Sequence, residues 1–222
     1  MINDLLSQNL FDLSKTIAEP LINKYDYPWE VLTEIKNYIL EIGKTLSSSE
    51  YEKKGENIWI SKNAHIALSS YISGPAIIQE GVEIRHCAYI RGNVIVGKHS
   101  VVGNSTEIKN SILFEETQAP HYNYVGDSIL GYKSHLGAGS IMSNIKSDKT
   151  NIDIKSGKEK IKTNLRKIGA MIGDHSEIGC NAVMNPGTIL GKNCCIYPLT
   201  MVRGYIEPNH IVKNNGEIIK KY

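Results

Sequence analysis

The sequence lacks a long apolar run and a basic leader, and each absence excludes a class of protein. No stretch of the 222 residues approaches the roughly 18 consecutive apolar residues that a membrane-spanning helix requires. The first residues, MINDLLSQNLFDL, include acidic side chains and no basic region before an apolar core, which is not the pattern of a secretory signal peptide. We therefore expect a cytoplasmic protein with no membrane partner.

Cysteine, tryptophan and phenylalanine are scarce, at four, two and two residues. The cysteines show no CxxC spacing, and the adjacent Cys194 and Cys195 would face opposite sides of a strand, so we expect free thiols in a reducing compartment. Charge is nearly balanced, with a net value of +2, which gives no sign of a nucleic-acid partner.

An apolar residue at every sixth position is the strongest pattern in the chain. It runs without a miss from Ile60 to Phe114, resumes from Tyr124 to Met142, and resumes again from Ile172 to Val202. A period of six is neither helical nor a simple strand alternation, and it is typical of hexapeptide repeats that build a β-helix. We therefore predict a mainly β fold, a prism of about six to seven turns in which each repeat forms one flat side.

Glycine often follows the inward residue of a repeat, as at Gly97, Gly103 and Gly131. We interpret this position as a corner of the prism, where glycine adopts backbone angles that strain other residues.

Residues 1–54 lack the six-residue period and are interpreted as a helical segment with a linker. A helix is predicted to begin at Pro28, a residue suited to the first helical position, and to end near Gly43, with its apolar residues on one face. We expect the helices to cover an end or a flank of the β-helix, and a direct part in substrate binding is the alternative. The β-helix domain then takes residues 55–222.

The period is interrupted twice, first at Glu115–Asn123 and then over the longer, lysine-rich Ser143–Gly169. From the second interruption we predict a protruding loop at about residues 145–168. A surface insertion without a role would be tolerated there, but long excursions from a rigid scaffold more often carry function, and we favour that interpretation.

The residues that could carry chemistry lie at or near these interruptions. His121 leaves the repeat in the first one and could act as a general base, although a lone histidine is more often structural. Arg91 and Lys109 are eighteen residues apart and should stack on adjacent turns, which favours an anionic ligand between them. A solvated pair of cations, or neutralisation of one of them by Glu107, stays open. Small residues at Gly137–Ser140 leave amides that could donate to a developing oxyanion.

Four motifs follow one another between Arg91 and Asn144: RGN, VGNSTEIKN, HYNYVGD and LGAGSIMSN. In this order they resemble the acetyltransferase domain of bacterial bifunctional glucosamine-1-phosphate acetyltransferase/uridylyltransferases. The basic loop followed by GAMIGD resembles archaeal and bacterial sugar-1-phosphate nucleotidylyltransferases with a fused C-terminal β-helix. The resemblance covers roughly residues 58–206.

The resemblance implies a left-handed parallel β-helix and a homotrimer with acyl-CoA between neighbouring subunits. It implies transfer of an acetyl group from acetyl-CoA to the amine of an amino-sugar phosphate, namely a hexosamine 1-phosphate or a related phosphorylated amine. The catalytic group would consist of His121 as general base, Asn144 at the border of the acetyl site, and Lys149 near a loop lysine that some members need.

The resemblance also implies an acceptor site and a donor site. Arg91 and Lys109 match the family's phosphate-binding cations, and Tyr124 matches a tyrosine that contacts the sugar phosphate. His135 stands where the family has an asparagine that helps to hold the sugar. The residues expected to contact acetyl-CoA are Ala138, Gly139, Cys180 and Pro198.

The chain departs from the family pattern at several positions. Gly92 replaces a proline, and Ile145 replaces a tyrosine after Asn144. The nucleotidylyltransferase domain is absent, so we expect no nucleotidyl transfer even though acetyl transfer is expected.

Two other hypotheses stay open. The β-helix could bind a sugar nucleotide or a protein partner without catalysing a reaction. It could also resemble the metal-dependent carbonic anhydrases of this architecture, which needs three histidines that converge between subunits, although we expect no metal. The candidates for that site are His65, His86, His99, His121 and His135.

Overall fold

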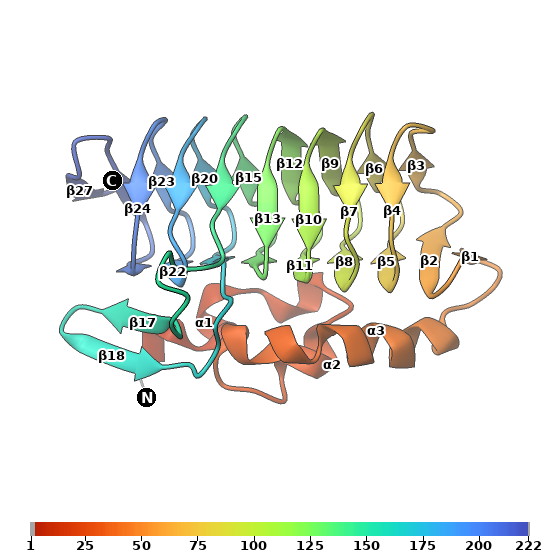
Figure 1. The fold of residues 1–222 in the computed structure, drawn as a ribbon, viewed down its shortest axis with the longest axis horizontal. Coiled ribbons are helices and arrows are strands. Elements are labelled where there is room, and N and C mark those ends of the chain that lie inside the picture. The colour runs from red at the N-terminus through yellow and green to blue at the C-terminus, as the bar shows by residue number, and fades with distance from the viewer. Residues whose placement is uncertain (1–2, 222) are drawn as a thin grey trace.

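The computed structural model describes residues 3–221. Met1, Ile2 and Tyr222, at the outer ends of the two predicted segments, lie outside the described residues. The chain winds into a three-sided prism whose sides are three sheets, here named A, B and C (Figure 1). Neighbouring strands within each sheet are parallel, except for the antiparallel pairs β1–β2 and β26–β27 at the two ends.

Each sheet collects strands from successive coils of the prism. In sheet order, sheet A consists of β1 (Tyr51–Lys54), β2 (Ile58–Ser61), β5 (Ala76–Ile78), β8 (Val94–Val96), β11 (Ser111–Leu113), β14 (Ile129–Leu130), β19 (Ala170–Ile172), β22 (Thr188–Leu190) and β25 (Tyr205–Ile206). Sheet B consists of β3 (His65–Ile66), β6 (Glu83–Ile84), β9 (Val101–Asn104), β12 (Gln118–His121), β15 (His135–Leu136), β20 (Glu177–Ile178), β23 (Cys195–Ile196), β26 (His210–Val212) and β27 (Ile218–Lys220). Sheet C consists of β4 (Tyr71–Ile72), β7 (Tyr89–Ile90), β10 (Glu107–Lys109), β13 (Tyr124–Gly126), β16 (Ile141–Met142), β21 (Val183–Met184) and β24 (Met201–Val202).

The inward side chains of the strands form apolar ladders that fill the prism. On sheet C, Ile90, Ile108, Val125 and Met142 pair strand to strand and are fully buried. Removing this surface from water at every coil drives the chain to wind, because each buried aliphatic side chain stabilises the fold by roughly 1.5–3 kcal/mol. The result is the left-handed parallel β-helix that was expected, and the seven strands of sheet C agree with the predicted number of turns.

The first predicted interruption is not a break in the repeat, and that prediction was wrong. The steps from Ile108 to Leu113 and from Val125 to Leu130 are five residues long instead of six, so the ladder continues without a break through Ala119. In these two coils, the connection from sheet C to sheet A is one residue shorter.

This shift moves two residues out of the ladder. Phe114 belongs instead to a second apolar cluster, which lies outside the prism between sheet A and the N-terminal segment. Its ring packs on Phe11 with ring centroids 5.1 Å apart. Tyr124 is half-buried and precedes the inward Val125, so it faces outward from sheet C. His121 therefore lies at the end of a regular strand rather than in a segment that leaves the repeat.

The glycine that follows an inward residue has a different cause from the one predicted. Gly97 and Gly103 do not have positive φ angles; the corner conformation falls two residues later, at His99 (φ 58°) and Ser105 (φ 53°). A Cβ at Gly103 would overlap the backbone of Pro120 on the next coil. Close approach of the coils, rather than backbone strain at a corner, therefore requires glycine here.

The N-terminal segment lies along the outer face of sheet A, below the prism in Figure 1. It therefore covers a flank of the β-helix and not an end. Its elements are η1 (Asn3–Leu5), α1 (Ser7–Leu10), η2 (Leu13–Lys15), α2 (Glu19–Ile22), η3 (Pro28–Thr33), α3 (Ile35–Ile42) and η4 (Gly43–Thr45). The helix predicted from Pro28 is divided at Glu34 into a 3₁₀ part and an α part.

Apolar side chains from both partners form the contact between the helices and sheet A. Ile35 and Ile39 of α3 are fully buried in the same cluster as Ile77, Ile95 and Ile112, which point outward from sheet A. The amphipathic pattern of the segment is therefore explained by a second core outside the prism.

The second interruption is a loop, as predicted, and it contains its own structure. Strands β17 (Asp153–Ser156) and β18 (Glu159–Lys162) form an antiparallel hairpin. Ile152, Ile154 and Ile168 are buried in the cluster shared with the helices, so the loop is anchored beside sheet A. The division into residues 1–54 and 55–222 as separate domains stays a prediction.

No helix in the described part of the chain is long and apolar enough to cross a membrane. All four cysteines are free thiols, as predicted.

Candidate active site

One long edge of the prism, between sheets B and C, brings together His121 and the predicted donor residues. The Gly139 N–H donates to the His121 carbonyl (3.0 Å), and the Asn181 N–H donates to the Ala138 carbonyl (2.8 Å). The Leu199 N–H continues the series by donating to the Cys180 carbonyl (2.9 Å). The residues that lie on this B–C edge, from coil to coil, are His86, Asn104, His121, Ala138, Cys180 and Pro198.

The His121 imidazole is available for chemistry. Its side chain is exposed at the end of β12, and among the described residues it has no hydrogen-bond or ion-pair partner. The backbone is fixed instead, because the His121 N–H donates to Asn123 Oδ1 (3.1 Å) and β12 pairs with β9 at Asn104. A rigid backbone with a free imidazole suits a group that exchanges protons with a ligand.

Most backbone N–H groups at Gly137–Ser140 already donate hydrogen bonds within the protein, so few of them are left to form the expected oxyanion site. The Gly137, Gly139 and Ser140 N–H groups all donate to carbonyl groups of the protein. Only the Ala138 N–H in this stretch has no partner among the described residues. Ala138 lies on the coil next to His121, so its amide is the remaining candidate donor to a developing oxyanion.

The outer face of sheet C lies between this edge and the opposite one, with Tyr124 near its middle. The Asn144 Nδ2 donates to the Tyr124 hydroxyl oxygen (3.2 Å). Burial raises the pKa of Tyr124, and the nearby carboxylates Asp127 and Glu107 add to this effect. The hydroxyl therefore keeps its proton at neutral pH and can donate it in a hydrogen bond to a ligand.

The second edge, between sheets C and A, carries the predicted cations. Arg91 Nη1 lies 2.6 Å from Glu107 Oε1, and Lys109 Nζ lies 3.2 Å from Asp127 Oδ2. The hydrogen bond with Glu107 raises the pKa of Arg91 above its ordinary value. Each stacked cation therefore has its own carboxylate, and neutralisation of Arg91 by Glu107 is what the structure contains. The residues on this C–A edge are Arg91, Lys109, Gly126, Ser143, Asn185 and Arg203.

Asp127 connects the groups on this edge, although no role for it was predicted from the sequence. Its side chain is buried and accepts hydrogen bonds from Asn110 Nδ2 (2.9 Å), Asn144 Nδ2 and Lys109. It also holds a positive φ of 48°, which places its carboxylate at the corner. The available signal was its position at the end of HYNYVGD, the motif that also holds His121 and Tyr124.

Two predicted site residues lie apart from this arrangement within one chain. His135 lies on sheet B, where its Nδ1 is 3.0 Å from Glu177 Oε2. Lys149 lies in a turn of the loop, with its backbone N–H donating to Lys146. Its exposed side chain contacts none of the other predicted site residues in the described part of the chain.

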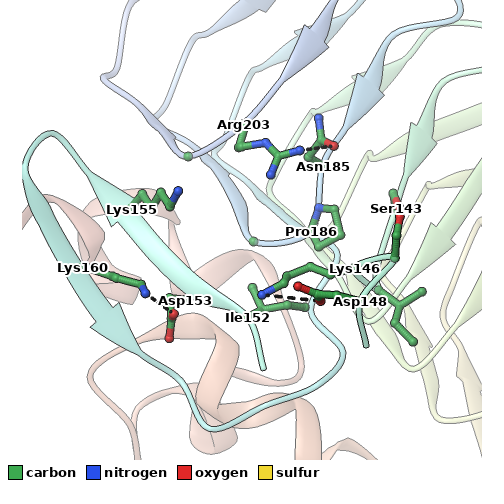
Figure 2. Close-up of a pocket in the computed structure, with 14 residues that line it drawn as sticks. Ser143, Lys146, Asp148, Ile152, Asp153, Lys155, Lys160, Asn185, Pro186 and Arg203 are labelled. Atoms are coloured by element: carbon green, nitrogen blue, oxygen red, sulfur yellow. Dashed lines mark hydrogen bonds and ion pairs between the residues drawn. The ribbon is translucent and has the colours of Figure 1, made fainter. Parts of the chain in front are cut away.

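The loop instead encloses a hollow of about 470 Å³ beside the C–A edge (Figure 2). Ser143 and Ile145 line it next to Asn144, and Arg203 lines its other end. Most of its charges are compensated, as the dashed lines in Figure 2 show, because Lys160 pairs with Asp153 (2.7 Å) and Lys146 with Asp148 (3.8 Å). Arg203 donates to Asn185 Oδ1 (3.2 Å).

No group of three or more His, Cys, Asp or Glu side chains within residues 3–221 is arranged to hold a metal ion. Of the histidines proposed for the metal hypothesis, His86 and His121 lie on the B–C edge, two coils apart, whereas His65 and His135 lie on strands β3 and β15 of sheet B.

Comparison with known proteins gives matches along most of the β-helix. Residues 72–158 match the family described as GMPPB C-terminal domain, and residues 169–204 match bacterial transferase hexapeptide (six repeats). The bifunctional protein GlmU of Methanococcus vannielii is 35% identical over 209 residues, which cover 85% of this chain and 50% of that protein. A bifunctional sugar-1-phosphate nucleotidylyltransferase/acetyltransferase of Sulfurisphaera tokodaii is 32% identical over 189 residues, 76% of this chain and 47% of that protein.

The chain thus spans about half the length of the curated relatives it matches. Among solved structures, a mutant of the N-acyltransferase AntD from Bacillus cereus, in complex with dTDP and coenzyme A, aligns over 74% of this chain and 80% of that chain. The identity is 16% and the TM-score 0.41, and a likeness of that size supports no argument about the site. From its repeats and its relatives, the chain belongs to the hexapeptide-repeat β-helix family and resembles the C-terminal acetyltransferase domain of GlmU proteins.

Proposed function

We propose that this chain transfers an acetyl group from acetyl-CoA to the amine of a phosphorylated amino sugar, such as a hexosamine 1-phosphate. One observation carries the proposal: a single sheet face has a free imidazole on one edge and a cluster of cations and amides on the other. Tyr124 lies between the two edges. A sugar that lies across this face would present its amine to His121 and its phosphate to Arg91 and Lys109.

The proposed chemistry is direct attack with His121 as general base. The imidazole accepts a proton as the amine nitrogen attacks the thioester carbonyl carbon, and the Ala138 N–H stabilises the charge on oxygen. The carbon–sulfur bond then breaks, and the departing thiolate takes the proton from His121. The products are the N-acetyl sugar and free CoA, without a covalent enzyme intermediate.

The acceptor would be held by groups that retain free donors. A guanidinium has five N–H groups, and Arg91 uses one of them with Glu107, so the others are available to phosphate oxygens. Asn144 is fixed by Tyr124 and Asp127 on the C–A edge, across sheet C from His121, so its proposed place beside the reacting carbonyl would require a neighbouring subunit. Lys149 lies on the exposed loop, and its part in catalysis stays a proposal that depends on a neighbouring subunit, as does that of His135.

The donor would lie along the B–C edge below His121. Side chains there are small or project outward: Ala138 and Gly139 are half-buried, and Cys180 and Pro198 are exposed. An extended pantetheine arm would lie along these residues.

Assembly as a homotrimer would close the site between neighbouring copies of the chain. The outer face of sheet C and the B–C edge carry an apolar strip that has no cover within one chain. Exposed residues of this strip are Leu68, Tyr71, Tyr89, Tyr122, Ile141, Tyr197, Leu199 and Met201. Contiguous apolar surface of this kind marks an interface, and a closed ring would pair each strip with the next subunit. With free thiols, such an assembly is proposed to work in the cytoplasm.

A thiol-release assay tests the proposal. Acetyl-CoA is incubated with the protein and a panel of hexosamine 1-phosphates, and free CoA is followed with a thiol reagent. We expect release that depends on the amino-sugar phosphate and no release with the corresponding N-acetylated sugar. Absence of release with every acceptor, although the protein binds one of them, would leave the non-catalytic binding protein as the better account.

A further inference from the structure

A second hollow, of about 600 Å³, lies beyond the C–A edge on the side away from His121. Three separate parts of the chain build it. The N-terminal segment contributes Leu32, Thr33 and Lys36, and the returning end of the loop contributes 165–167. The prism edge contributes Lys109 and its neighbours Asn93, Asn110 and Asp127.

The hollow gathers cations that have no partner. Lys36, Arg166 and Lys167 are exposed, and none of their side chains makes a hydrogen bond or an ion pair among the described residues. The single carboxylate in the lining, Asp127, is buried and already occupied by Lys109 and two amides. Like charges that converge without a counter-charge repel one another, and an anionic ligand relieves that repulsion.

The walls of this hollow are fixed to the prism by hydrogen bonds. Asn110 Nδ2 donates both to the Leu32 carbonyl (3.2 Å) and to Asp127 Oδ1 (2.9 Å), which ties the helical segment to the edge. The Ile168 N–H donates to the Asn144 carbonyl (3.1 Å), which ties the end of the loop to the same edge. The cations are therefore carried by backbone that the fold positions.

We propose that this basic hollow, formed by Lys36, Lys109, Arg166 and Lys167, binds a second phosphate group of the acceptor. The acceptor is then an amino sugar linked to a nucleoside diphosphate, rather than a sugar that carries one phosphate. This inference rests on the proposed function, in which Arg91 and Lys109 hold the phosphate attached to the sugar. Lys109 belongs to both sites, so a phosphate one bridging oxygen further from the sugar enters the hollow.

The lining beside the cations suits the rest of such a ligand. Leu32 and Leu165 supply apolar surface on the wall opposite the prism edge, and Asn93 supplies an amide. A nucleoside has a flat apolar face and polar edges, which match this combination. The inference also gives the N-terminal segment a part in binding, because Lys36 comes from it.

The test compares acceptors that differ only in the second phosphate and its nucleoside. The value of kcat/KM is measured for a hexosamine 1-phosphate and for the uridine, thymidine and guanosine diphosphate forms of the same sugar. We expect one diphosphate form to be at least about tenfold better, since one charge-assisted contact contributes a factor of that size. Equal values for all acceptors would overturn the inference.

Two variants and a matched control locate the effect. Lys36→Ala and Arg166→Ala should each lower kcat/KM for the diphosphate form about five- to tenfold and leave the value for the 1-phosphate within about twofold. Lys44→Ala removes an exposed, unpaired cation of the same N-terminal segment outside the hollow, and it should change neither value. Equal effects of Lys36→Ala and Lys44→Ala would contradict the assignment.

Direct binding separates a failure of this inference from a failure of the proposed function. Calorimetry with nucleoside diphosphates alone should give binding that Lys36→Ala weakens, whether or not acetyl transfer occurs. If the 1-phosphate is acetylated but no nucleoside diphosphate binds, the inference is wrong and the proposed function stands. If a nucleoside diphosphate binds and neither acceptor is acetylated, the hollow stands and the proposed function is wrong. Binding of pyrophosphate as tightly as of any nucleoside diphosphate would make the hollow a simple anion site and overturn the substrate assignment.

Discussion

Sheets A and C are built from the same coils, yet their outer faces have opposite characters. On sheet A the outward residues, such as Ile77, Ile95 and Ile112, are fully buried under the N-terminal segment. On sheet C the outward residues include Tyr89 and Ile141, which are 38% and 39% exposed. The inward ladders are alike, so the repeat fixes the scaffold. The outward residues differ, so the outer face of sheet A is covered by the helices and that of sheet C stays exposed.

The two edges of sheet C carry the exposed side chains of His121 and Arg91. The helices cover the outer face of sheet A and reach the C–A edge, where the Leu32 carbonyl accepts a hydrogen bond from Asn110 Nδ2 (3.2 Å). Sheet C has polar side chains on both edges of its exposed face. The following experiments test this contrast, beginning with the largest expected effect.

Removal of the His121 imidazole should have the largest effect. His121→Ala is expected to lower turnover by about 10²–10⁴, because general-base catalysis contributes a factor of that size. The matched control is His65→Ala, which removes an exposed histidine from sheet B. Turnover near that of the unmodified protein in His121→Ala would contradict the assignment of sheet C as the catalytic face.

Truncation on the two faces should separate stability from assembly. Ile112→Ala leaves a cavity under the helices and should lower the free energy of unfolding by about 2–5 kcal/mol in urea denaturation. That loss should be independent of protein concentration. Ile141→Ala should cost less, and its cost should depend on concentration because the proposed trimer would bury this residue between copies of the chain. Equal losses at all concentrations would remove the contrast between the two faces.

Substitution of Arg91 tests the proposed phosphate site on the C–A edge. Arg91→Ala should raise KM for the acceptor about tenfold, as expected for one charge-assisted contact, and leave KM for acetyl-CoA within about twofold. Arg85→Ala is the control, because Arg85 also pairs with a carboxylate, Glu83 at 2.8 Å, but lies on the sheet B side. An equal change in KM for the acceptor in both variants would contradict a phosphate site at Arg91.

Thiol labelling tests the proposed donor site on the B–C edge, and it has the smallest expected effect of these experiments. Burial raises the pKa of Cys194 to about 11, so at pH 8 its thiol stays protonated and should not react with iodoacetamide. Cys180 is exposed and should be alkylated, and CoA should slow that alkylation several-fold. Mass spectrometry measures both sites. Labelling of Cys180 at the same rate with and without CoA would argue against a donor site on this edge.

The sequence predicted the ladder but not its register at the first interruption. Leu113 and Phe114 are adjacent apolar residues, as are Tyr124 and Val125, so the six-residue spacing alone cannot decide which member of each pair points inward. Phe114 points outward because Phe11 offers it a partner, and that contact joins residues far apart in the chain. Tertiary packing therefore settled what periodicity left ambiguous.

Part of the candidate site was predictable, because residues eighteen positions apart stack on adjacent coils. The eighteen-residue separation placed Arg91 and Lys109 on one edge, and the resemblance named His121 and Asn144. Asp127 was missed because a buried carboxylate at a corner leaves no periodic signal. The hollow beside Lys36 was also out of reach, because it forms only when the N-terminal segment lies along the prism.

A structure of the protein with CoA and an amino-sugar phosphate tests the central claim most directly. The account predicts the pantetheine arm along the B–C edge, with the sulfur beside His121, and the sugar phosphate within hydrogen-bond reach of Arg91 or Lys109. CoA bound at another edge of the prism, with His121 facing solvent, would contradict the assignment of sheet C as the reaction face.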